Sequence, residues 1–393
     1  MSSTTIDGKA PSLRASTDER RLPWWHLVLT AVAGLLLAIA ILAALGALSL
    51  PGAVVLGYVL HLIIGYTYSR VREGRRWAAD RLATLLVVGA FVLAIIPLVS
   101  LLWEVIRRGA GRLVTPGFLT ADMQGVTGGM DAGGIGHAIV GTLLVTLGAA
   151  IIAVPIGLFT AIFLVEYARE GRLRSLGRGI TFLVDVMTGI PSIVAGLFAL
   201  ALFITATQVF DVAGGHQGDP GIRMGVMGSV ALAVLMIPTV VRSSEEMLRL
   251  VPMELREASY ALGVPKWLTI VKVVLRTAIA GLTTTVTLAI ARVIGETAPL
   301  LLTAEVFATC NYNMFAGRMQ TLPTYINQQY RADLATCHSD TVTNPFTGLQ
   351  YLCSTQVNFD RAWGAALALI IIVMILNIIA RLVSYYFAPK AGR

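Results

Sequence analysis

Long apolar stretches separated by short polar segments run through most of the chain. A helix of about 20 mainly apolar residues crosses the roughly 30 Å hydrocarbon layer of a bilayer. Stretches of that length predict eight transmembrane helices, which cover residues 24–48, 50–68, 82–105, 138–165, 180–206, 223–241, 277–303 and 362–387. The pattern therefore predicts an all-α fold, a polytopic bundle of membrane helices.

Composition agrees with a bilayer as the main solvent. Of the 393 residues, 56% are apolar and 13% are charged, whereas soluble domains carry about 25% charged residues. The mean hydropathy is +0.76. The first apolar run is longer than the roughly 7–15 residues of a signal peptide's apolar region, so we expect a retained helix. Residues 1–23 precede it, and we expect this polar segment to be disordered.

The basic residues predict the orientation of the helices. Lys and Arg favour the cytoplasmic side in short loops. With a cytoplasmic N-terminus and eight spans, the cytoplasmic segments hold 22 of the 30 Lys and Arg residues, and the C-terminal tail 388–393 is cytoplasmic as well. The net charge of +8 is then spread over five short segments, which argues against nucleic-acid binding.

A polar, basic segment, Ser69–Arg81, divides the chain. Residues 24–81 form a two-helix hairpin and a linker, which we expect to lie on the cytoplasmic face. Residues 82–387 form the main transmembrane domain with six spans. Proline occurs within five spans, where it removes a backbone donor and favours a kink. Packing kinks and hinges of a moving bundle both remain open at these positions: Pro97, Pro155, Pro191, Pro238 and Pro299.

All three cysteines lie in one long outer loop, 304–360. That placement fits an oxidising exterior and allows one disulfide with one thiol left over. We favour a Cys337–Cys353 pair, which closes a 17-residue loop. Three unpaired thiols are the alternative. We expect no metal site, because Cys337 and the adjacent His338 would point apart and no paired ligand spacing is present.

The longest cytoplasmic connection, 242–276, predicts a short helix with a sharp end. Gly263 stops this helix and Pro265 opens the next one, the usual asymmetry of helix ends. One small, mildly apolar face has members spaced three and four residues apart: Leu255, Ala258, Ser259 and Leu262. Such a face suits the groove of a partner protein. An amphipathic elbow that lies on the lipid surface is the alternative.

The run Glu257-Ala258-Ser259-Tyr260-Ala261-Leu262-Gly263 resembles the EAA loop of ATP-binding-cassette importer permeases, in which Glu-Ala-Ala is followed three residues later by Gly. Three further stretches occur in the order typical of the PstA-type permeases of phosphate-specific transport systems: Thr188–Gly196, Ile237–Glu246 and Ala291–Leu300. The resemblance covers about residues 82–387. It implies a MetI-like permease core in the plasma (inner) membrane of a bacterium.

Some features depart from the family pattern. Ser259 replaces the second Ala of the loop, and Arg276 stands where family members usually have Pro. The first two spans and the cysteine-bearing insert at about 334–356 look like additions. The roles of these added parts stay open.

The resemblance also implies a set of partners. In the family, the EAA loop is the coupling helix that docks into the ATPase, and the residues matching it here are Glu257, Ala258, Ser259, Leu262 and Gly263. The implied partners are a second permease subunit of the PstC type, a dimer of PstB-type ATPases and an extracytoplasmic phosphate-binding protein of the PstS type. The chain has no Gly-x-x-x-x-Gly-Lys-Ser/Thr loop. We therefore expect a non-enzymatic transport subunit that binds no cofactor itself, with ATP and magnesium on the ATPase.

Arg292 and Glu296 fall within the seventh predicted span. An ionised side chain at membrane depth costs roughly 2.5–3.5 kcal/mol on insertion scales, so both should face protein or water. Four residues apart, they share one helix face with Gly281, Thr285 and Thr303. The guanidinium fork of Arg suits a tetrahedral oxyanion. We assign Arg292, Glu296 and Thr285 to the substrate pathway; an Arg–Glu pair that only fixes helix packing is the alternative.

Arg242 ends the sixth predicted span. It is either the inner mouth of the anion pathway, the role we assign to it, or a side chain that reaches to the membrane interface. We expect Asp185, early in the fifth span, to be interfacial and structural.

The sequence favours a permease subunit of an ATP-driven importer of inorganic phosphate. Arg chemistry does not separate phosphate from sulfate, molybdate or a phosphonate, and only the resemblance selects phosphate. A secondary transporter driven by an ion gradient is a second class, and it would work without ATP. A membrane-embedded enzyme is a third, but His61 is the single histidine that we expect at membrane depth.

Overall fold

The structure, a computed structural model, describes residues 22–23, 25–168, 171–210 and 223–387. Among these residues, seven helices are long and apolar enough to cross a membrane, and a strongly bent helix pair makes an eighth span if it is counted as one. The predicted helical bundle of about eight spans is confirmed. The predicted disordered segment, apart from residues 22–23, and the tail 388–393 lie outside the described residues.

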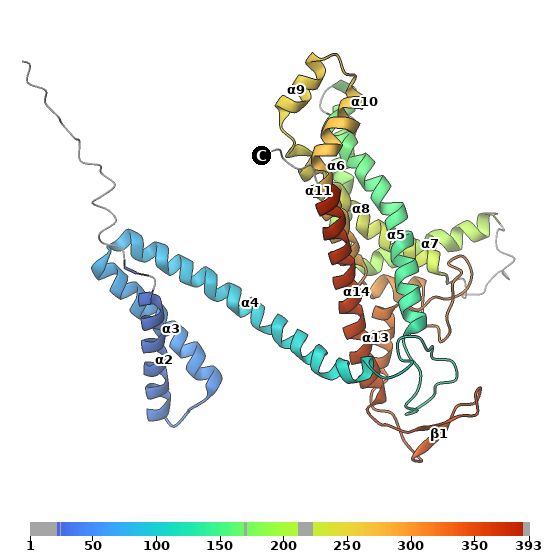
Figure 1. Ribbon diagram of the computed structural model, residues 1–393, viewed down its shortest axis with the longest axis horizontal. Helices are drawn as coiled ribbons and strands as arrows, with labels where there is room; N and C mark the ends of the chain where they lie inside the picture. The colour runs from blue at the N-terminus through green and yellow to red at the C-terminus, as the bar shows by residue number, and fades with distance from the viewer. Residues whose placement is uncertain (1–21, 24, 169–170, 211–222, 388–393) are drawn as a thin grey trace, which may run out of the picture. The chain divides into compact units, whose positions relative to one another are not determined.

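The chain divides into two compact units, residues 1–102 and 103–393 (Figure 1). The sequence placed this boundary after residue 81 instead. Most of the third predicted span, residues 82–102, belongs to the first unit. The Tyr58 hydroxyl donates a hydrogen bond to the carbonyl of Leu85 at 2.8 Å.

The first unit contains α2 (Trp25–Ala44), α3 (Leu50–Arg72) and most of α4 (Arg75–Leu113). The helices α2 and α3 approach each other closely at a glycine. A Cβ atom added to Gly34 would lie 2.8 Å from the backbone of both Gly57 and His61. Small residues allow membrane helices this close approach.

The segment Ser69–Arg81, which the sequence predicted to be a linker, is largely helical. Both of its ends are helical, and only Glu73 and Gly74 separate α3 from α4. Gly74 has a φ of +95°, a conformation that glycine adopts without strain. Arg81 closes the turn with an ion pair to Glu73 at 2.5 Å. The polar side chains thus cap a tight helix–helix corner.

The second unit is organised around one buried helix, α8. Its longest helices are α5 (Gly136–Ile162), α8 (Gly225–Arg249), α11 (Leu275–Val293) and α14 (Val357–Phe387). Its shorter helices are α6 (Gly171–Thr188), α7 (Ser192–Phe210), α9 (Met253–Ala261), α10 (Lys266–Thr269), α12 (Ala298–Thr303) and α13 (Leu322–Arg331). Two π-helical turns, η1 (Phe163–Tyr167) and η2 (Ile270–Val274), extend α5 and precede α11. The largest core cluster joins α8 to α5, α11 and α12 through Val145, Met236, Ala289 and Leu300.

Two predicted spans are interrupted, not continuous. The fifth consists of α6 and α7, which meet at an angle of 110°. The seventh consists of α11 and α12, separated by residues 294–297. The prediction of continuous helices was wrong at both places because glycine and proline occur together at each break. Gly189 and Pro191 lie at the first break, and Gly295 and Pro299 lie at or beside the second.

The other three prolines lie inside unbroken helices. Pro97 is within α4, Pro155 within α5 and Pro238 within α8. The five prolines of the spans therefore divide into two classes, three in helix interiors and two at helix starts. The break beside Pro191 carries the bend of 110° between α6 and α7.

The loop 304–360, here called the disulfide loop, lies at the end of the second unit opposite α9 (Figure 1). Cys337 and Cys353 form a disulfide, the pairing favoured from the sequence, and Cys310 is unpaired. Between the paired cysteines, β1 (Thr341–Thr343) and β2 (Gln350–Leu352) form an antiparallel hairpin in which Val342 faces Tyr351. The disulfide thus closes the base of a small, separate hairpin.

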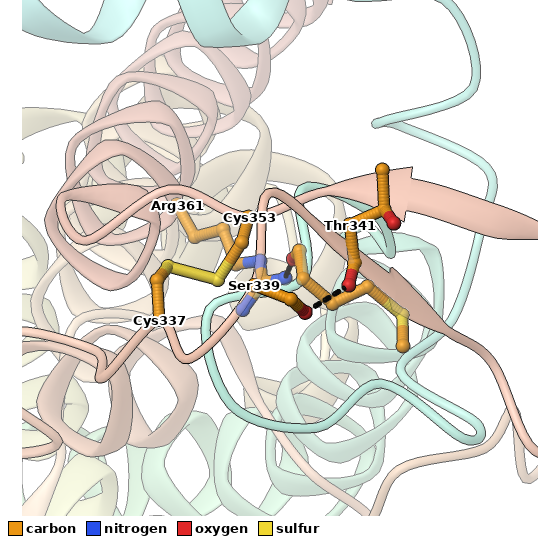
Figure 2. Close-up of a disulfide and its surroundings, with 6 residues drawn as sticks. Cys337, Ser339, Thr341, Cys353 and Arg361 are labelled. Atoms are coloured by element: carbon orange, nitrogen blue, oxygen red, sulfur yellow. Dashed lines mark hydrogen bonds between the residues drawn. A yellow bond between two sulfur atoms is a disulfide. The ribbon is translucent and has the colours of Figure 1, made fainter.

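Arg361 ties the base of this hairpin to a second loop (Figure 2). It lies in the first turns of α14 and is 1% exposed. Its guanidinium donates to the carbonyls of Met130 and Ala132, the latter at 2.7 Å. Met130 in turn forms a β-bridge with Cys353. A buried cation with backbone acceptors therefore joins the disulfide loop to the loop before α5.

The packing around the disulfide predicts that Gly129→Ala will hinder its formation. A Cβ atom at this position would lie 2.6 Å from Sγ of Cys353 and 2.8 Å from Sγ of Cys337. A gel-shift assay with a thiol-reactive polymer should show a larger fraction of free Cys337 and Cys353. Gly111→Ala is the matched control, since a Cβ atom there meets nothing within 4 Å. Complete pairing in the Gly129 variant would contradict this packing.

Candidate functional site

The three stretches that carry the resemblance meet at α8. Gly196 of α7 lies against α12, where a Cβ atom on Gly196 would be 2.7 Å from Cα of Pro299. Arg292, in the last turn of α11, donates from Nη1 to Oγ1 of Thr239 on α8 at 3.3 Å. Segments far apart in sequence are therefore neighbours, and both interrupted spans pack against the same helix.

A cluster of charges lies one turn further along α8. Arg242 forms ion pairs with Asp185 of α6 and with Glu245, the latter at 3.2 Å. Glu245 also pairs with Arg249 at 2.5 Å. The side chain of Arg242 is 32% exposed, whereas that of Glu245 is 8% exposed. Asp185, to which the sequence assigned a structural role, is thus the direct partner of a pathway candidate.

Arg292 and Glu296 are not neighbours on one continuous helix. The helix α11 ends at Val293, so Glu296 lies in the break before α12. Within the described residues, no ion pair joins the two side chains, and Thr239 is the hydrogen-bond partner of Arg292. The prediction of a shared helical face was wrong here because Gly295 ends the helical path between them.

The rest of the predicted polar stripe packs against protein. Thr285 is 5% exposed. A Cβ atom on Gly281 would lie 2.7 Å from Sδ of Met247 on α8. Thr303 is buried, and its hydroxyl donates to the carbonyl of Pro299 at 2.9 Å. These three residues therefore allow close packing in this chain, and Arg292 is the exposed member of the stripe.

One face of α8 remains accessible in the chain by itself. Most of the helix is buried, but one row of residues at spacings of three and four is partly or fully exposed: Leu235, Thr239, Arg242, Glu246 and Arg249. This row, here called the open face of α8, includes the hydrogen-bond partner of Arg292. An apolar residue begins the row, and polar or charged side chains complete it. Such a face can present guanidinium groups to an anion in a water-filled passage.

The helix α9 forms as the sequence predicted and carries two different faces. Gly263 follows it with a φ of +73°, and Pro265 precedes α10. Leu255 and Leu262 are exposed, by 43% and 83%, and Ala258 is exposed as well. Ser259 was predicted on the same face but is 8% exposed, and its Oγ lies 2.8 Å from Oγ1 of Thr269. The outer face is therefore narrower and more apolar than predicted.

A buried ion pair that the sequence analysis missed lies on the inner face of α9. Nη2 of Arg256 lies 3.1 Å from Oε1 of Glu166 in η1, and both side chains are 4% exposed. Arg256 also donates to the carbonyl of Leu248 at 2.9 Å and to that of Val251 at 2.8 Å. The spacing of three residues between Arg256 and Ser259 was the signal available in the sequence, since it places both on one helix face.

A further charged group that the sequence analysis did not single out lies at the other end of α8. Glu305 accepts two ion pairs, from Arg223 just before α8 and from Arg318 at 2.8 Å. Glu305 has a φ of +59°, which is unusual for a residue with a side chain. Two guanidinium groups and one carboxylate give this group a net positive charge.

Two titratable groups near the disulfide loop are shifted by burial. Burial raises the pKa of the Tyr325 hydroxyl to about 12. Burial also raises the pKa of the Cys310 thiol, and the charge of Asp122 adds to the effect. Both groups are therefore protonated at neutral pH, and neither supplies a nucleophile there.

The chain is similar to known membrane components of transport systems. Residues 153–393 match the family model described as "Binding-protein-dependent transport system inner membrane component". The chain is 43% identical over 311 residues to the phosphate transport system permease protein PstA 1 of Mycobacterium tuberculosis (strain CDC 1551 / Oshkosh), which covers 79% of this chain and 90% of that protein. It is 32% identical over 321 residues to the phosphate transport system permease protein PstA of Yersinia pestis, covering 82% of this chain and 94% of that one.

Among solved structures, an inward-facing form of the MetNI methionine ABC transporter is similar. The match has a TM-score of 0.42 and 18% identity, and it covers 65% of this chain and 94% of the other.

The burial of the Arg256–Glu166 pair predicts a large loss of stability for Glu166→Ala. Removing one partner leaves a buried charge without compensation, which costs about 3–5 kcal/mol. Thermal unfolding of the purified protein in detergent should show a clearly lower midpoint. Glu104→Ala is the control, because Glu104 pairs with the exposed Arg107 and Arg108 and exposed pairs contribute little. Equal midpoints for the two variants would argue against a desolvated pair.

Proposed function

We propose that this chain carries inorganic phosphate across a membrane. It belongs to the family of binding-protein-dependent transport system inner membrane components. Within that family it belongs to the PstA-type permeases of phosphate transport systems. It is a multi-pass membrane protein. The proposal extends the substrate named for its relatives to this chain, as one permease subunit of an ATP-driven importer.

The observation that carries the proposal is the placement of Arg292 and Arg242 along the open face of α8. Arg292 bonds Thr239, and Arg242 lies three residues further on, so two guanidinium groups occupy successive turns. A guanidinium offers a fixed fork of donors to a tetrahedral oxyanion. Asp185 and Glu245 offset the charge of Arg242, which suits conduction because a passage that binds its ion too tightly does not release it. Glu296, in the break beside Arg292, stays part of the proposed pathway.

The open face of α8 supports a second permease subunit as partner. A polar row at membrane depth needs protein or water over it, not lipid. A second permease subunit of the PstC type, packed opposite α8, would close the passage between the two chains. Thr285 and the small residues beside it then serve the packing of α11 onto α8.

The outer face of α9 supports an ATPase as the partner at this end. Leu255, Ala258 and Leu262 form a narrow apolar face, with Glu257 between them. A pair of PstB-type ATPases would grip this face and close on ATP with magnesium, so that this chain itself requires no cofactor. An extracytoplasmic binding protein of the PstS type would deliver the anion at the opposite end of the unit, beside the disulfide loop.

The proposed location is the inner membrane of a bacterium, with both chain ends and α9 in the cytoplasm. The distribution of Lys and Arg supports this orientation. The disulfide supports it as well, because the opposite end of the unit would then face an oxidising compartment.

Uptake into vesicles tests the substrate and the role of Arg292 together. Labelled phosphate should enter vesicles that contain the full complex only when ATP and the binding protein are present. Arg292→Gln should abolish uptake while the complex still assembles, because the amide cannot replace the charged fork at the open face of α8. Arg276→Gln, an exposed arginine at the start of the same helix, should transport normally.

Several outcomes of this experiment would change the conclusion. Normal uptake by the Arg292 variant would remove Arg292 from the pathway. Uptake that ignores ATP would point to a carrier driven by an ion gradient. Stronger competition by sulfate, molybdate or a phosphonate than by unlabelled phosphate would assign another oxyanion.

The apolar outer face of α9 predicts that Ala258→Trp will separate this chain from its ATPase. The indole would occupy the space where a groove must approach the exposed Ala258. Co-purification on a tagged ATPase should fall to a small fraction of the wild-type amount. Ala79→Trp, at an exposed alanine of α4, is the control and should co-purify fully. Undiminished recovery of the Ala258 variant would place the docking surface elsewhere.

A further inference from the structure

Two buried polar contacts join α9 to the membrane helices, and each lies at a π-helical turn. Arg256 reaches Glu166, which belongs to η1 at the end of α5. Ser259 reaches Thr269, which directly precedes η2 at the start of α11. Single π-helical turns interrupt the regular hydrogen bonding of a helix and occur often at functional sites. The contacts of α9 therefore meet α5 and α11 where their backbones depart from regular α-helix.

Arg256 also joins α9 to the end of α8. Its guanidinium donates to the carbonyl of Leu248, in the last turn of α8, at 2.9 Å and to that of Val251 just beyond it at 2.8 Å. The last carbonyls of a helix have no partner within the helix, and a cation there also interacts favourably with the helix dipole. One side chain thus holds three elements: α9, the end of α8 and the end of α5.

Because the Arg256–Glu166 ion pair is buried, a contribution to stability is a weak explanation for its presence. Both side chains are 4% exposed, and a buried ion pair is often no more stable than apolar residues of the same size. The guanidinium, however, is planar and donates in fixed directions. A joint of this kind resists a change of angle between the elements that it connects.

We propose that Arg256 is the positioning residue that transmits movement of α9 to α8 and α5. This inference rests on the proposed function, in which an ATPase grips the outer face of α9. Displacement of α9 then moves the end of α8 through the carbonyls of Leu248 and Val251, and it moves η1 through Glu166. Because Thr239 and Arg242 lie on α8, the same displacement alters the open face that lines the passage.

The test follows the movement of α8 and requires no phosphate. A reporter cysteine, Leu235→Cys, is placed on the open face of α8 in a Cys310→Ser background, and the full complex is reconstituted in lipid nanodiscs. Maleimide labelling is measured with and without ATP plus vanadate, and ATP hydrolysis is measured in parallel. In the otherwise unchanged complex, nucleotide should alter the labelling rate.

The deciding variant combines Arg256→Met with Glu166→Leu, which removes both charges and leaves neither buried alone. Hydrolysis should continue, while the effect of nucleotide on labelling should shrink by about two- to thirtyfold, the range for residues that modulate coupling between sites. Arg256→Lys keeps the charge but loses the fork, so its effect should be intermediate. Arg107→Met removes an exposed ion pair of α4, outside the open face of α8, and should change neither measurement.

Two results would overturn the inference. The first is a full nucleotide effect in the double variant, which would make the contact merely structural. The second is an unchanged complex that hydrolyses ATP without any change in labelling. If the double variant no longer binds the ATPase, Arg256→Lys replaces it in the test. A full nucleotide effect in Arg256→Lys would then make the contact merely structural. Failure of phosphate uptake alone would refute the proposed substrate and leave this transmission contact standing.

Discussion

The structure depends on one constraint, which is that backbone polar groups at membrane depth must find partners within the protein. Lipid offers no hydrogen bonds, so membrane-spanning segments are helices, and interruptions are tolerated only where protein or water covers them. The rule applies to both interrupted spans. Arg292, directly before the break between α11 and α12, bonds Thr239 of α8, and Gly196 of α7 lies against Pro299 of α12. Gly189, Pro191 and Gly295 are themselves exposed in this chain, so the rule requires water or a partner protein over both breaks.

Charged side chains serve two separate purposes in the second unit. Those on the open face of α8 remain partly exposed, so their groups can exchange partners, and Arg242 already has two carboxylates within reach. Arg256 is buried, bonds two backbone carbonyls and lies 3.1 Å from the carboxylate of Glu166. The first arrangement suits a place where an anion arrives and leaves. The second suits a joint that keeps its geometry while the elements around it move.

The sequence predicted the parts of the fold that depend on local pattern. The apolar stretches located the membrane helices, and the Gly263–Pro265 pair located the end of α9, because hydropathy and helix-end chemistry act over a few residues. The disulfide pairing was also predicted from the position of the cysteines. The breaks at Gly189 and Gly295 were missed, since glycine and proline are compatible with continuous membrane helices when neighbouring helices support them.

The contacts that depend on distant segments could not be predicted in the same way. The pairing of Arg292 with Glu296 assumed an unbroken helix, and the structure gives Arg292 a partner on α8 instead. The Arg256–Glu166 pair joins residues 90 positions apart. No local pattern relates them, although the helical spacing of Arg256 and Ser259 indicated a shared face. The inward position of Ser259 was missed for the same reason: its hydrogen-bond partner, Thr269, lies beyond the turn at Gly263.

The length of α4 has a consequence for its position in a bilayer. Its 39 residues span about 58 Å, at 1.5 Å for each residue. Membrane helices tilt by at most about 40°, and even at that angle α4 is longer than the roughly 30 Å of hydrocarbon. One or both of its ends must therefore project into the headgroup layer or the surrounding water. The charges agree, since Arg75, Arg76 and Arg81 lie near its start and Glu104 to Arg112 near its end, with Leu82–Trp103 uncharged between them. A hydropathy pattern detects only the part of a long helix that contacts the lipid tails. The predicted span 82–105 is therefore shorter than the helix.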